Sequence, residues 1–217
     1  MKGFNYLNRG LLGFFGIAIL MGASCTAPVN LNYESARMMK KGEVEVQGSY
    51  SQYFEGAEKI SSNVGGRIGF GINENYNLKM RVEIIALPQS VNASEVDPDL
   101  SFLYFELDNK ISLTKNLALS LPLCHYSLGD GMGYSVFDPR LYITMRSNDV
   151  FEFTVIPKCH FFLDAGSPPM PAISVGMGFS SDLNKWAIRP EIGYDVFFSA
   201  GVGLSFYLGG TQKKADK

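Results

Sequence analysis

Residues that build most reactive sites are scarce in this sequence. Its 217 residues include three cysteines and two histidines, and its formal charge is −2. Three cysteines are too few for a disulfide framework, and their positions match neither a Cys-x-x-Cys motif nor the spacing of zinc ligands. The small net charge argues against a surface for nucleic acid. We therefore expect no metal, no cofactor and no nucleic-acid partner.

Apolar stretches long enough to form a transmembrane helix are also lacking. The apolar part of "LLGFFGIAILMGASC", residues 11–25, covers about 11 residues, whereas a membrane-spanning helix needs roughly 18. Lys2 and Arg9 flank this run and small residues end it, which is the organisation of a secretory signal peptide. We assign residues 1–24 to a signal peptide and exclude them from the fold.

The end of this stretch, Ala23, Ser24 and Cys25, resembles the cleavage motif of bacterial lipoproteins, in which the cysteine is lipidated and becomes the new N-terminus. Gly22 stands where that motif prefers leucine. The sequence therefore predicts a lipid anchor at Cys25. Ordinary cleavage near Ala23 or Ala27 with an unmodified cysteine is the alternative.

Helical periodicity is missing from nearly all of the remaining chain, and alternation takes its place. In "YNLKMRVEII", residues 76–85, Leu78, Met80 and Val82 share one parity. Lys79 and Arg81 share the other. Because side chains alternate across a β-strand, one face of this strand meets an apolar environment and the other face a polar one.

About ten segments show this alternation. Each is close to the roughly 9 to 11 residues that a transmembrane strand needs. Glycine is frequent at 23 residues and aromatic residues make up 13% of the chain, a profile that favours an all-β architecture. The segments span residues 43–54, 60–72, 76–87, 100–113, 117–127, 134–146, 150–163, 171–180, 185–197 and 201–208.

The connections between segments alternate in length. Tight polar turns follow the second, fourth, sixth and eighth segments: "NENY", "TKN", "SND" and "SDLN". Longer loops follow the third, fifth and seventh: "PQSVNASEVDPD", "LGDGMGYS" and "DAGSPP". Membrane barrels show this asymmetry, with brief turns at one end and longer loops at the other.

The two parities separate an almost uncharged face from a face with charges of both signs. The uncharged face suits lipid, because Lys or Arg costs about 2 to 4 kcal/mol at mid-bilayer. Charges of alternating sign can pair inside a narrow lumen, where Gly65, Gly69, Gly176 and Gly178 leave room for them. We predict a lumen charge network of Arg67, Lys79, Arg81, Glu83, Glu106, Asp108, Lys110, Asp138, Arg140, Glu152, Lys158, His160, Arg189 and Glu191.

Prolines inside four of the segments conflict with regular strands. Pro122, Pro139, Pro157 and Pro190 each lack the N–H that a closed barrel would use. A charged residue follows each of the last three. We predict bulges at Pro139, Pro157 and Pro190 that redirect the lumen charges.

The last segment, "GVGLSFYLGG", resembles the aromatic C-terminal strand of the compact outer-membrane β-barrel proteins of Gram-negative bacteria, although "GGTQKKADK" follows the pair Phe206 and Tyr207. The resemblance implies an all-β, antiparallel up-and-down transmembrane β-barrel over residues 42–208, with about ten strands and 8 or 12 as alternatives, and a polar tail at 209–217. It also implies an outer-membrane location, with outer-membrane lipids and the barrel assembly machinery as partners.

Residues 25–41 are the one mature stretch without strand alternation. We interpret them as a tether between the anchor and the first strand or as a segment at the periplasmic mouth. Passage into the lumen is the remaining alternative.

A catalytic group is hard to assemble from these residues. His160 shares a strand face with Lys158 and Glu152, but no serine or cysteine nucleophile motif surrounds it. The leading interpretation is a small non-enzymatic outer-membrane barrel with a structural, surface-interaction or narrow-transport role. Two alternatives are a barrel enzyme acting on lipid or peptide and a soluble periplasmic lipoprotein whose barrel binds a ligand.

Overall fold

The computed structural model describes residues 29–87, 101–128, 133–146, 148–163 and 167–209. The predicted signal peptide and Cys25 lie outside the described residues, as does the tail after Gly209. Regular structure in the described part is entirely β, and none of it is a helix long and apolar enough to cross a membrane. The strands are β1 (Glu43–Glu55), β2 (Glu58–Asn73), β3 (Tyr76–Ala86), β4 (Ser101–Thr114), β5 (Leu117–Ser120), β6 (Leu123–Leu128), β7 (Gly133–Phe137), β8 (Arg140–Arg146), β9 (Phe151–Phe162), β10 (Met170–Phe179), β11 (Trp186–Tyr194) and β12 (Phe198–Gly209).

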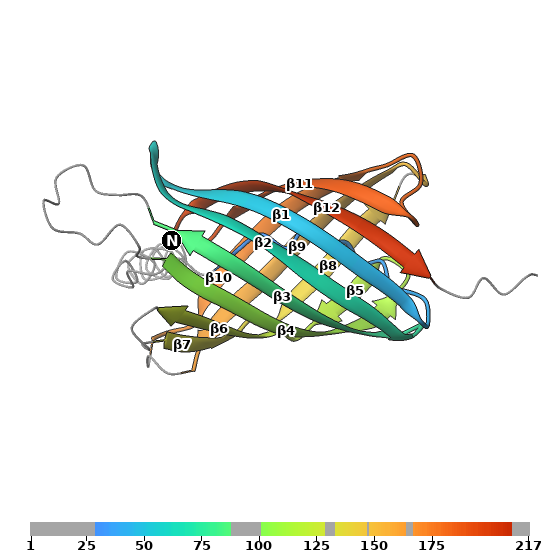
Figure 1. The fold of residues 1–217 in the computed structure, drawn as a ribbon, viewed down its shortest axis with the longest axis horizontal. Coiled ribbons are helices and arrows are strands. Elements are labelled where there is room, and N and C mark those ends of the chain that lie inside the picture. The colour runs from blue at the N-terminus through green and yellow to red at the C-terminus, as the bar shows by residue number, and fades with distance from the viewer. Residues whose placement is uncertain (1–28, 88–100, 129–132, 147, 164–166, 210–217) are drawn as a thin grey trace, which may run out of the picture.

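Neighbouring strands pair antiparallel and close into a barrel (Figure 1). β5 and β6 pair one after the other with β4, and β7 and β8 pair one after the other with β9. Each of these two successions takes one place in the wall, so the twelve strands form a ten-stranded barrel. Pairing of β12 with β1 joins the last strand to the first. The predicted antiparallel up-and-down barrel of about ten strands is confirmed.

The prolines interrupt pairing without shifting it. Pro122 lies between β5 and β6, and Pro139 lies between β7 and β8. In β11 the ladder to β12 continues through Pro190, and the register with β10 is the same on both sides of it. Pro157 in β9 keeps an unbroken ladder to β10. The predicted bulges at Pro139, Pro157 and Pro190 are therefore wrong, because each proline removes a hydrogen bond toward one neighbour while the chain keeps its register.

The two faces of the wall are as different as the alternation predicts. Val82 and Ile84 are 44% and 53% exposed on the outside, whereas Arg81 and Glu83 are each 1% exposed on the inside. The outside is an apolar belt and the inside is a polar lumen. A soluble barrel with an apolar interior does not fit this arrangement.

The two ends of the barrel also differ. At the short-turn end, residues 74–75 join β2 to β3 and residues 115–116 join β4 to β5. β1 begins and β12 ends at this end (Figure 1). At the opposite, long-loop end, 14 residues separate Ala86 of β3 from Ser101 of β4. The alternation of short and long connections read from the sequence therefore matches the two ends.

Candidate functional site in the barrel lumen

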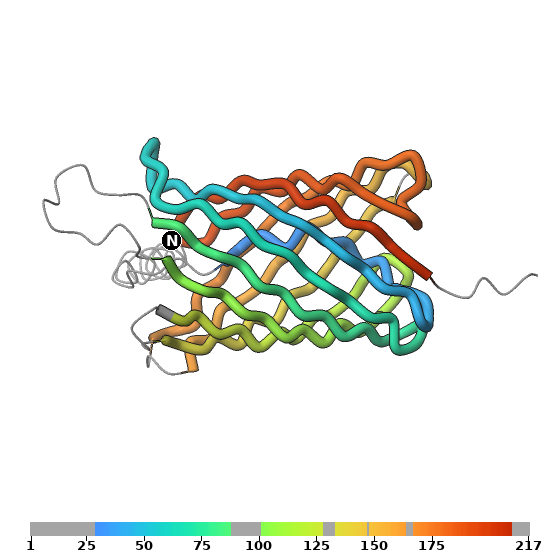
Figure 2. Tube along the Cα trace, viewed as in Figure 1, coloured from blue at the N-terminus to red at the C-terminus, as the bar shows by residue number. Residues whose placement is uncertain are grey.

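The lumen is occupied by the chain itself. Residues 29–42, which we call the lumen segment, run through the interior ahead of β1 (Figure 2). Leu31, Asn32 and Tyr33 have no exposed surface, and Glu34 is 4% exposed. Of the alternatives that the sequence left open for this stretch, the structure shows passage into the lumen, and it corrects the tether interpretation for residues 29–41.

The direction of the lumen segment follows from its two ends. Val29 packs with Ile85 and Tyr126, which lie near the long-loop ends of β3 and β6, and its N–H donates to the Tyr126 hydroxyl over 2.7 Å. At the other end the Gly42 N–H donates to the Gly71 carbonyl over 2.8 Å, next to the turn between β2 and β3. The chain thus travels from the long-loop end to the short-turn end (Figure 2). Gly42, with φ of 76°, then reverses it into β1.

Side chains of the wall satisfy the carbonyls of the lumen segment one at a time. A buried backbone oxygen needs a hydrogen-bond donor, and this extended stretch pairs with no strand. Arg81 Nη1 donates to the Leu31 carbonyl over 2.7 Å, and Arg67 Nη1 donates to the Asn32 carbonyl over 2.8 Å. Further donors are Lys158 to Asn30, Gln47 to Tyr33 and Lys110 to Ser35.

The amides of the same segment donate to acceptors on the wall. Glu191 accepts the N–H groups of both Asn32 and Tyr33. The N–H of Ala36 donates to Thr144 Oγ1 over 2.7 Å. The wall therefore supplies both donors for the carbonyls and acceptors for the amides of the segment.

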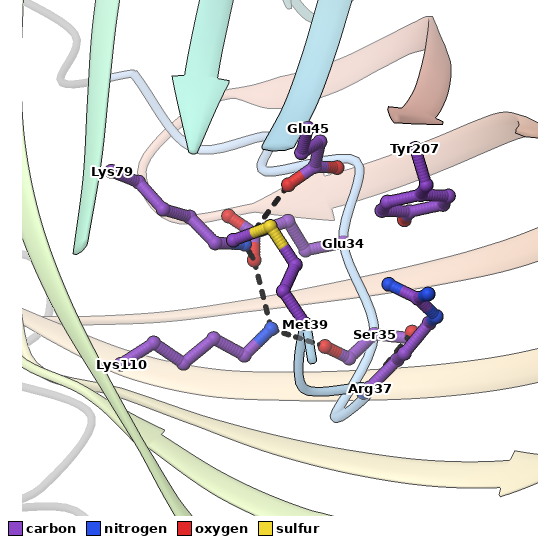
Figure 3. Close-up of a pocket in the computed structure, with 8 residues that line it drawn as sticks. All are labelled: Glu34, Ser35, Arg37, Met39, Glu45, Lys79, Lys110 and Tyr207. Atoms are coloured by element: carbon purple, nitrogen blue, oxygen red, sulfur yellow. Dashed lines mark hydrogen bonds and ion pairs between the residues drawn. The ribbon is translucent and has the colours of Figure 1, made fainter. Parts of the chain in front are cut away.

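A single carboxylate of the segment forms ion pairs with three cations of the wall. Glu34 forms ion pairs with Lys79 of β3 and with Lys110 of β4, the latter over 2.8 Å (Figure 3), and it also forms an ion pair with Arg67 of β2. Glu45 of β1 also pairs with Lys79, over 3.2 Å. Each of these side chains is at most 3% exposed. Buried cations need this partner, because an unpaired buried charge is costly.

Other wall charges pair among themselves. Arg140 contacts Glu106 over 2.6 Å and Asp138 over 2.7 Å, and Asp138 contacts His160 Nδ1 over 3.1 Å. Arg81 pairs with Glu83, Arg189 pairs with Glu152, and Ser120 donates to Asp108. These contacts join charges and polar groups of the wall to one another, beside the contacts to the segment.

An acidic group also lies at the long-loop end of the lumen. Asp195 follows β11, and burial raises the pKa of its carboxyl, although the Phe197 N–H donates to it over 2.7 Å. Electrostatic attraction to the His160 and Lys158 side chains partly offsets this rise in the pKa.

Glycines of β12 make room for the one aromatic ring of the segment. A Cβ on Gly203 would lie 2.5 Å from Tyr33 Cβ, and a Cβ on Gly201 would lie 2.3 Å from the Tyr33 hydroxyl. Tyr33 itself has a φ of 56°, which is uncommon for a residue with a side chain. The ring therefore occupies a notch that any larger residue would fill.

Two cavities border the lumen segment among the described residues. The hollow beside Glu34, drawn in Figure 3, has a volume of about 10 Å³, close to the least that can hold one water molecule. A larger cavity of about 230 Å³ lies at the short-turn end and is lined by Arg37, Lys40, Lys115 and Arg146, among others. Among the described residues, the space beside Glu34 is nearly filled, whereas the short-turn mouth of the lumen is hollow.

All fourteen residues of the predicted charge network lie on the lumen side, each at most 6% exposed. The sequence did not identify their main partner, the lumen segment with Glu34. One signal pointed to it: Arg67 lies directly opposite Arg81 in the β2–β3 pairing. Like charges in that position destabilise a sheet unless a third group joins them.

Neither histidine and neither described cysteine lines the two cavities given above. His160 is 1% exposed and its carboxylate partner Asp138 is equally buried. His125 faces outward, with Nδ1 3.1 Å from Ser135 Oγ. Cys124 is buried 3.3 Å from the Tyr104 hydroxyl. In the part of the chain that the structure describes, no group of His, Cys, Asp and Glu has the arrangement of a metal site.

Comparisons with known proteins found similar solved structures but no sequence relative. No family model and no curated protein matches the chain. Among solved structures, a de novo designed transmembrane β-barrel is 9% identical and aligns with 79% of this chain and 99% of its own, with a TM-score of 0.41. The N-terminal barrel domain of Pseudomonas aeruginosa OprF is 15% identical over 78% and 100% of the two chains, with a TM-score of 0.37. The Escherichia coli outer membrane protease OmpT is 13% identical over 77% and 94%, with a TM-score of 0.41.

The class of the protein follows from its own architecture. A closed antiparallel wall, an apolar outer belt and a charged lumen together define a transmembrane β-barrel of the outer-membrane type. Within that class, this chain has a lumen filled by the residues that precede its first strand.

Proposed function

We propose that the protein is a small, sealed outer-membrane barrel with a structural or surface-interaction role. The lumen segment carries this proposal, because it occupies the bore and many of its backbone groups, together with Glu34, are bonded to the wall. Of the three roles that the sequence left open, narrow transport has the least support. Any solute would have to displace Glu34 from three buried cations.

The outer-membrane location is part of the same proposal. The apolar belt supports outer-membrane lipids as partners, and a β-barrel of this class needs the barrel assembly machinery for insertion. The short-turn end would then face the periplasm, as is usual for such barrels. The predicted lipid anchor at Cys25 also belongs to this proposal.

We also propose that the protein is not an enzyme. The one buried histidine–carboxylate pair, His160 with Asp138, is on the lumen side of the wall, and both residues are 1% exposed. The lumen segment lies beside this pair, since its Asn30 carbonyl accepts a hydrogen bond from Lys158 on the same face of β9, and we infer that it keeps substrates away. Activity of a purified sample on lipid or peptide that is lost in His160→Gln would favour the barrel enzyme instead.

Conductance in planar bilayers tests the seal. The wild-type protein, inserted from detergent, should show no stable open current, whereas a variant lacking residues 29–41 should conduct ions. Heat-modifiable mobility in gels would show that each sample contains folded barrel. Long-lived open channels in the folded wild-type protein would contradict the proposal.

A matched point variant avoids a large deletion. Glu34→Lys puts a fourth cation among Arg67, Lys79 and Lys110 and should produce intermittent openings. Glu74→Lys, at the exposed turn between β2 and β3, adds the same charge outside the lumen and should leave the barrel closed.

A further inference from the structure

The cavity at the short-turn end of the lumen is lined by more positive than negative groups. Its cations come from the lumen segment, the β4–β5 turn and β8, and they are Arg37, Lys40, Lys115 and Arg146. Glu152 is the one carboxylate among the lining residues that the structure describes, and it already pairs with Arg189. The cavity therefore carries an excess of positive charge.

The counter-charges that the protein offers these cations are few. Among the described residues, neither Lys40 nor Lys115 takes part in an ion pair. Arg146 pairs with Asp149 over 2.9 Å, but the Asp149 side chain is 81% exposed, and an exposed ion pair contributes little. Three of the four cations are thus free to bind an anion in the cavity.

Arg37 gives a second, independent indication of a ligand. Its side chain is 10% exposed and is held in place, with Nη2 2.9 Å from Glu43 Oε1 and the guanidinium carbon 3.9 Å from the centre of the Tyr207 ring. Its buried Nη1 has no hydrogen-bond partner in the described part of the chain. Because buried donors are nearly always satisfied, this one indicates an acceptor that the protein does not supply.

We propose that the cavity binds a small free compound that carries a phosphate or diphosphate group. The cavity volume is about 230 Å³, whereas one water molecule needs about 10 to 15 Å³, so a group of many atoms fits. Phosphate oxygens accept hydrogen bonds on all sides, which suits cations that come from three separate elements. Arginine binds phosphate through its planar fork, and lysine binds it as a point charge.

The position of the cavity favours a free compound over a lipid headgroup. Thr144 and Glu152 line it from the lumen side of the wall, and Lys115 and Asn184 line it from turns at the end of the barrel. The cavity is therefore at the mouth of the lumen and not on the apolar belt. It faces the periplasm in the orientation given under the proposed function, although binding itself does not depend on that orientation.

Calorimetric titration of the folded protein in uncharged detergent tests the site, with inorganic pyrophosphate as the probe. We expect one pyrophosphate per barrel and an affinity that falls as salt is raised, because salt screens exposed charges. Lys115→Gln should weaken binding several-fold, and Lys40→Gln with Lys115→Gln should weaken it at least tenfold. Lys59→Gln is the matched control, because it removes the same charge from an exposed position at the opposite end of the barrel. Absence of binding, or binding that the double variant leaves unchanged, would overturn the inference.

Hydrogen exchange of the wild-type protein tests the site without any substitution. A bound phosphate joins Arg37 and Lys40 of the lumen segment to Lys115 and Arg146 of the wall, so it stabilises the docked segment. Saturating pyrophosphate should therefore slow exchange of the amides of residues 36–40. Unchanged exchange would place the bound anion elsewhere and refute the inference, and this result stands even if the double variant fails to fold.

Two comparisons identify the ligand. Citrate, a carboxylate of similar charge, should bind at least tenfold more weakly than pyrophosphate, and equal affinities would overturn the assignment to phosphate. A phospholipid that is retained by purified wild-type protein and lost from the double variant would identify a headgroup as the occupant and overturn the assignment to a free compound. Conductance tests the seal separately, so a closed barrel that binds no pyrophosphate would refute this inference and leave the proposed function intact.

Discussion

Replacing Glu34 by glutamine should release the lumen segment while leaving its shape nearly unchanged. The substitution removes the one negative charge that Arg67, Lys79 and Lys110 share, and only Glu45 remains to pair with the first two. Lys110 then has no ion pair among the described residues. Breaking a buried ion pair from one side costs about 3 to 5 kcal/mol. At 1.4 kcal/mol for each factor of ten, the ratio of docked to released segment should fall roughly 100- to 4000-fold.

Hydrogen exchange measured by mass spectrometry reads this ratio directly. The amides of residues 29–36 should lose protection in folded Glu34→Gln protein, while the wall strands keep theirs. Glu58→Gln is the matched control, because Glu58 is exposed at the β1–β2 turn. Unchanged protection of residues 29–36 in a folded Glu34→Gln sample would show that Glu34 does not hold the segment.

Three further predictions concern the notch, the belt and the anchor. Gly203→Ala should displace Tyr33 and lower the stability of the docked lumen segment by about 1 to 3 kcal/mol. Gly176→Ala is the control and should leave it unchanged, because its new Cβ would have no neighbour closer than 3.5 Å. Hydrogen exchange of the amides of the lumen segment distinguishes the two variants. Val82→Arg should cost about 2 to 4 kcal/mol in folding titrations into vesicles, and a harmless substitution in correctly inserted protein would mean that this face does not meet lipid. Cys25→Ala should abolish incorporation of labelled fatty acid while the barrel still folds, and undiminished labelling would remove the predicted anchor.

The wall could be predicted from the sequence because one physical constraint acts on every strand. Lipid outside and paired charge inside impose a two-residue alternation of apolar and polar side chains on every strand. The neighbours Val82 and Arg81 therefore indicate, from the sequence alone, that they face opposite sides of the wall. The short turns fix the hairpins, and the hairpins fix the register. The predicted bulges at the prolines were wrong, because a strand can also accommodate a missing N–H by leaving a gap in the pairing with one neighbour. At Pro190 the pairing with β10 has such a gap, while the pairing with β12 continues.

The lumen segment could not be predicted in the same way. Its partners are single side chains on different strands, such as Arg67 on β2, Lys110 on β4 and Glu191 on β11. A stretch bonded in this manner has no period of its own and reads as an irregular connection. The one sequence feature that indicated a further partner was the pair of arginines, Arg67 and Arg81, directly opposite each other in the β2–β3 hairpin.

The seam between β1 and β12 has a consequence for the order of assembly. It joins the first and last strands through twelve residue pairs, so it can form only after the whole wall has been made. The lumen segment precedes β1 in the chain and is therefore available before any strand is. If the wall closes around the segment, Glu34 pairs with Arg67, Lys79 and Lys110 during closure. These cations are then never left without it in a water-filled lumen. The final product is then a ring of strands assembled on a peptide template, with the template covalently joined to the first strand.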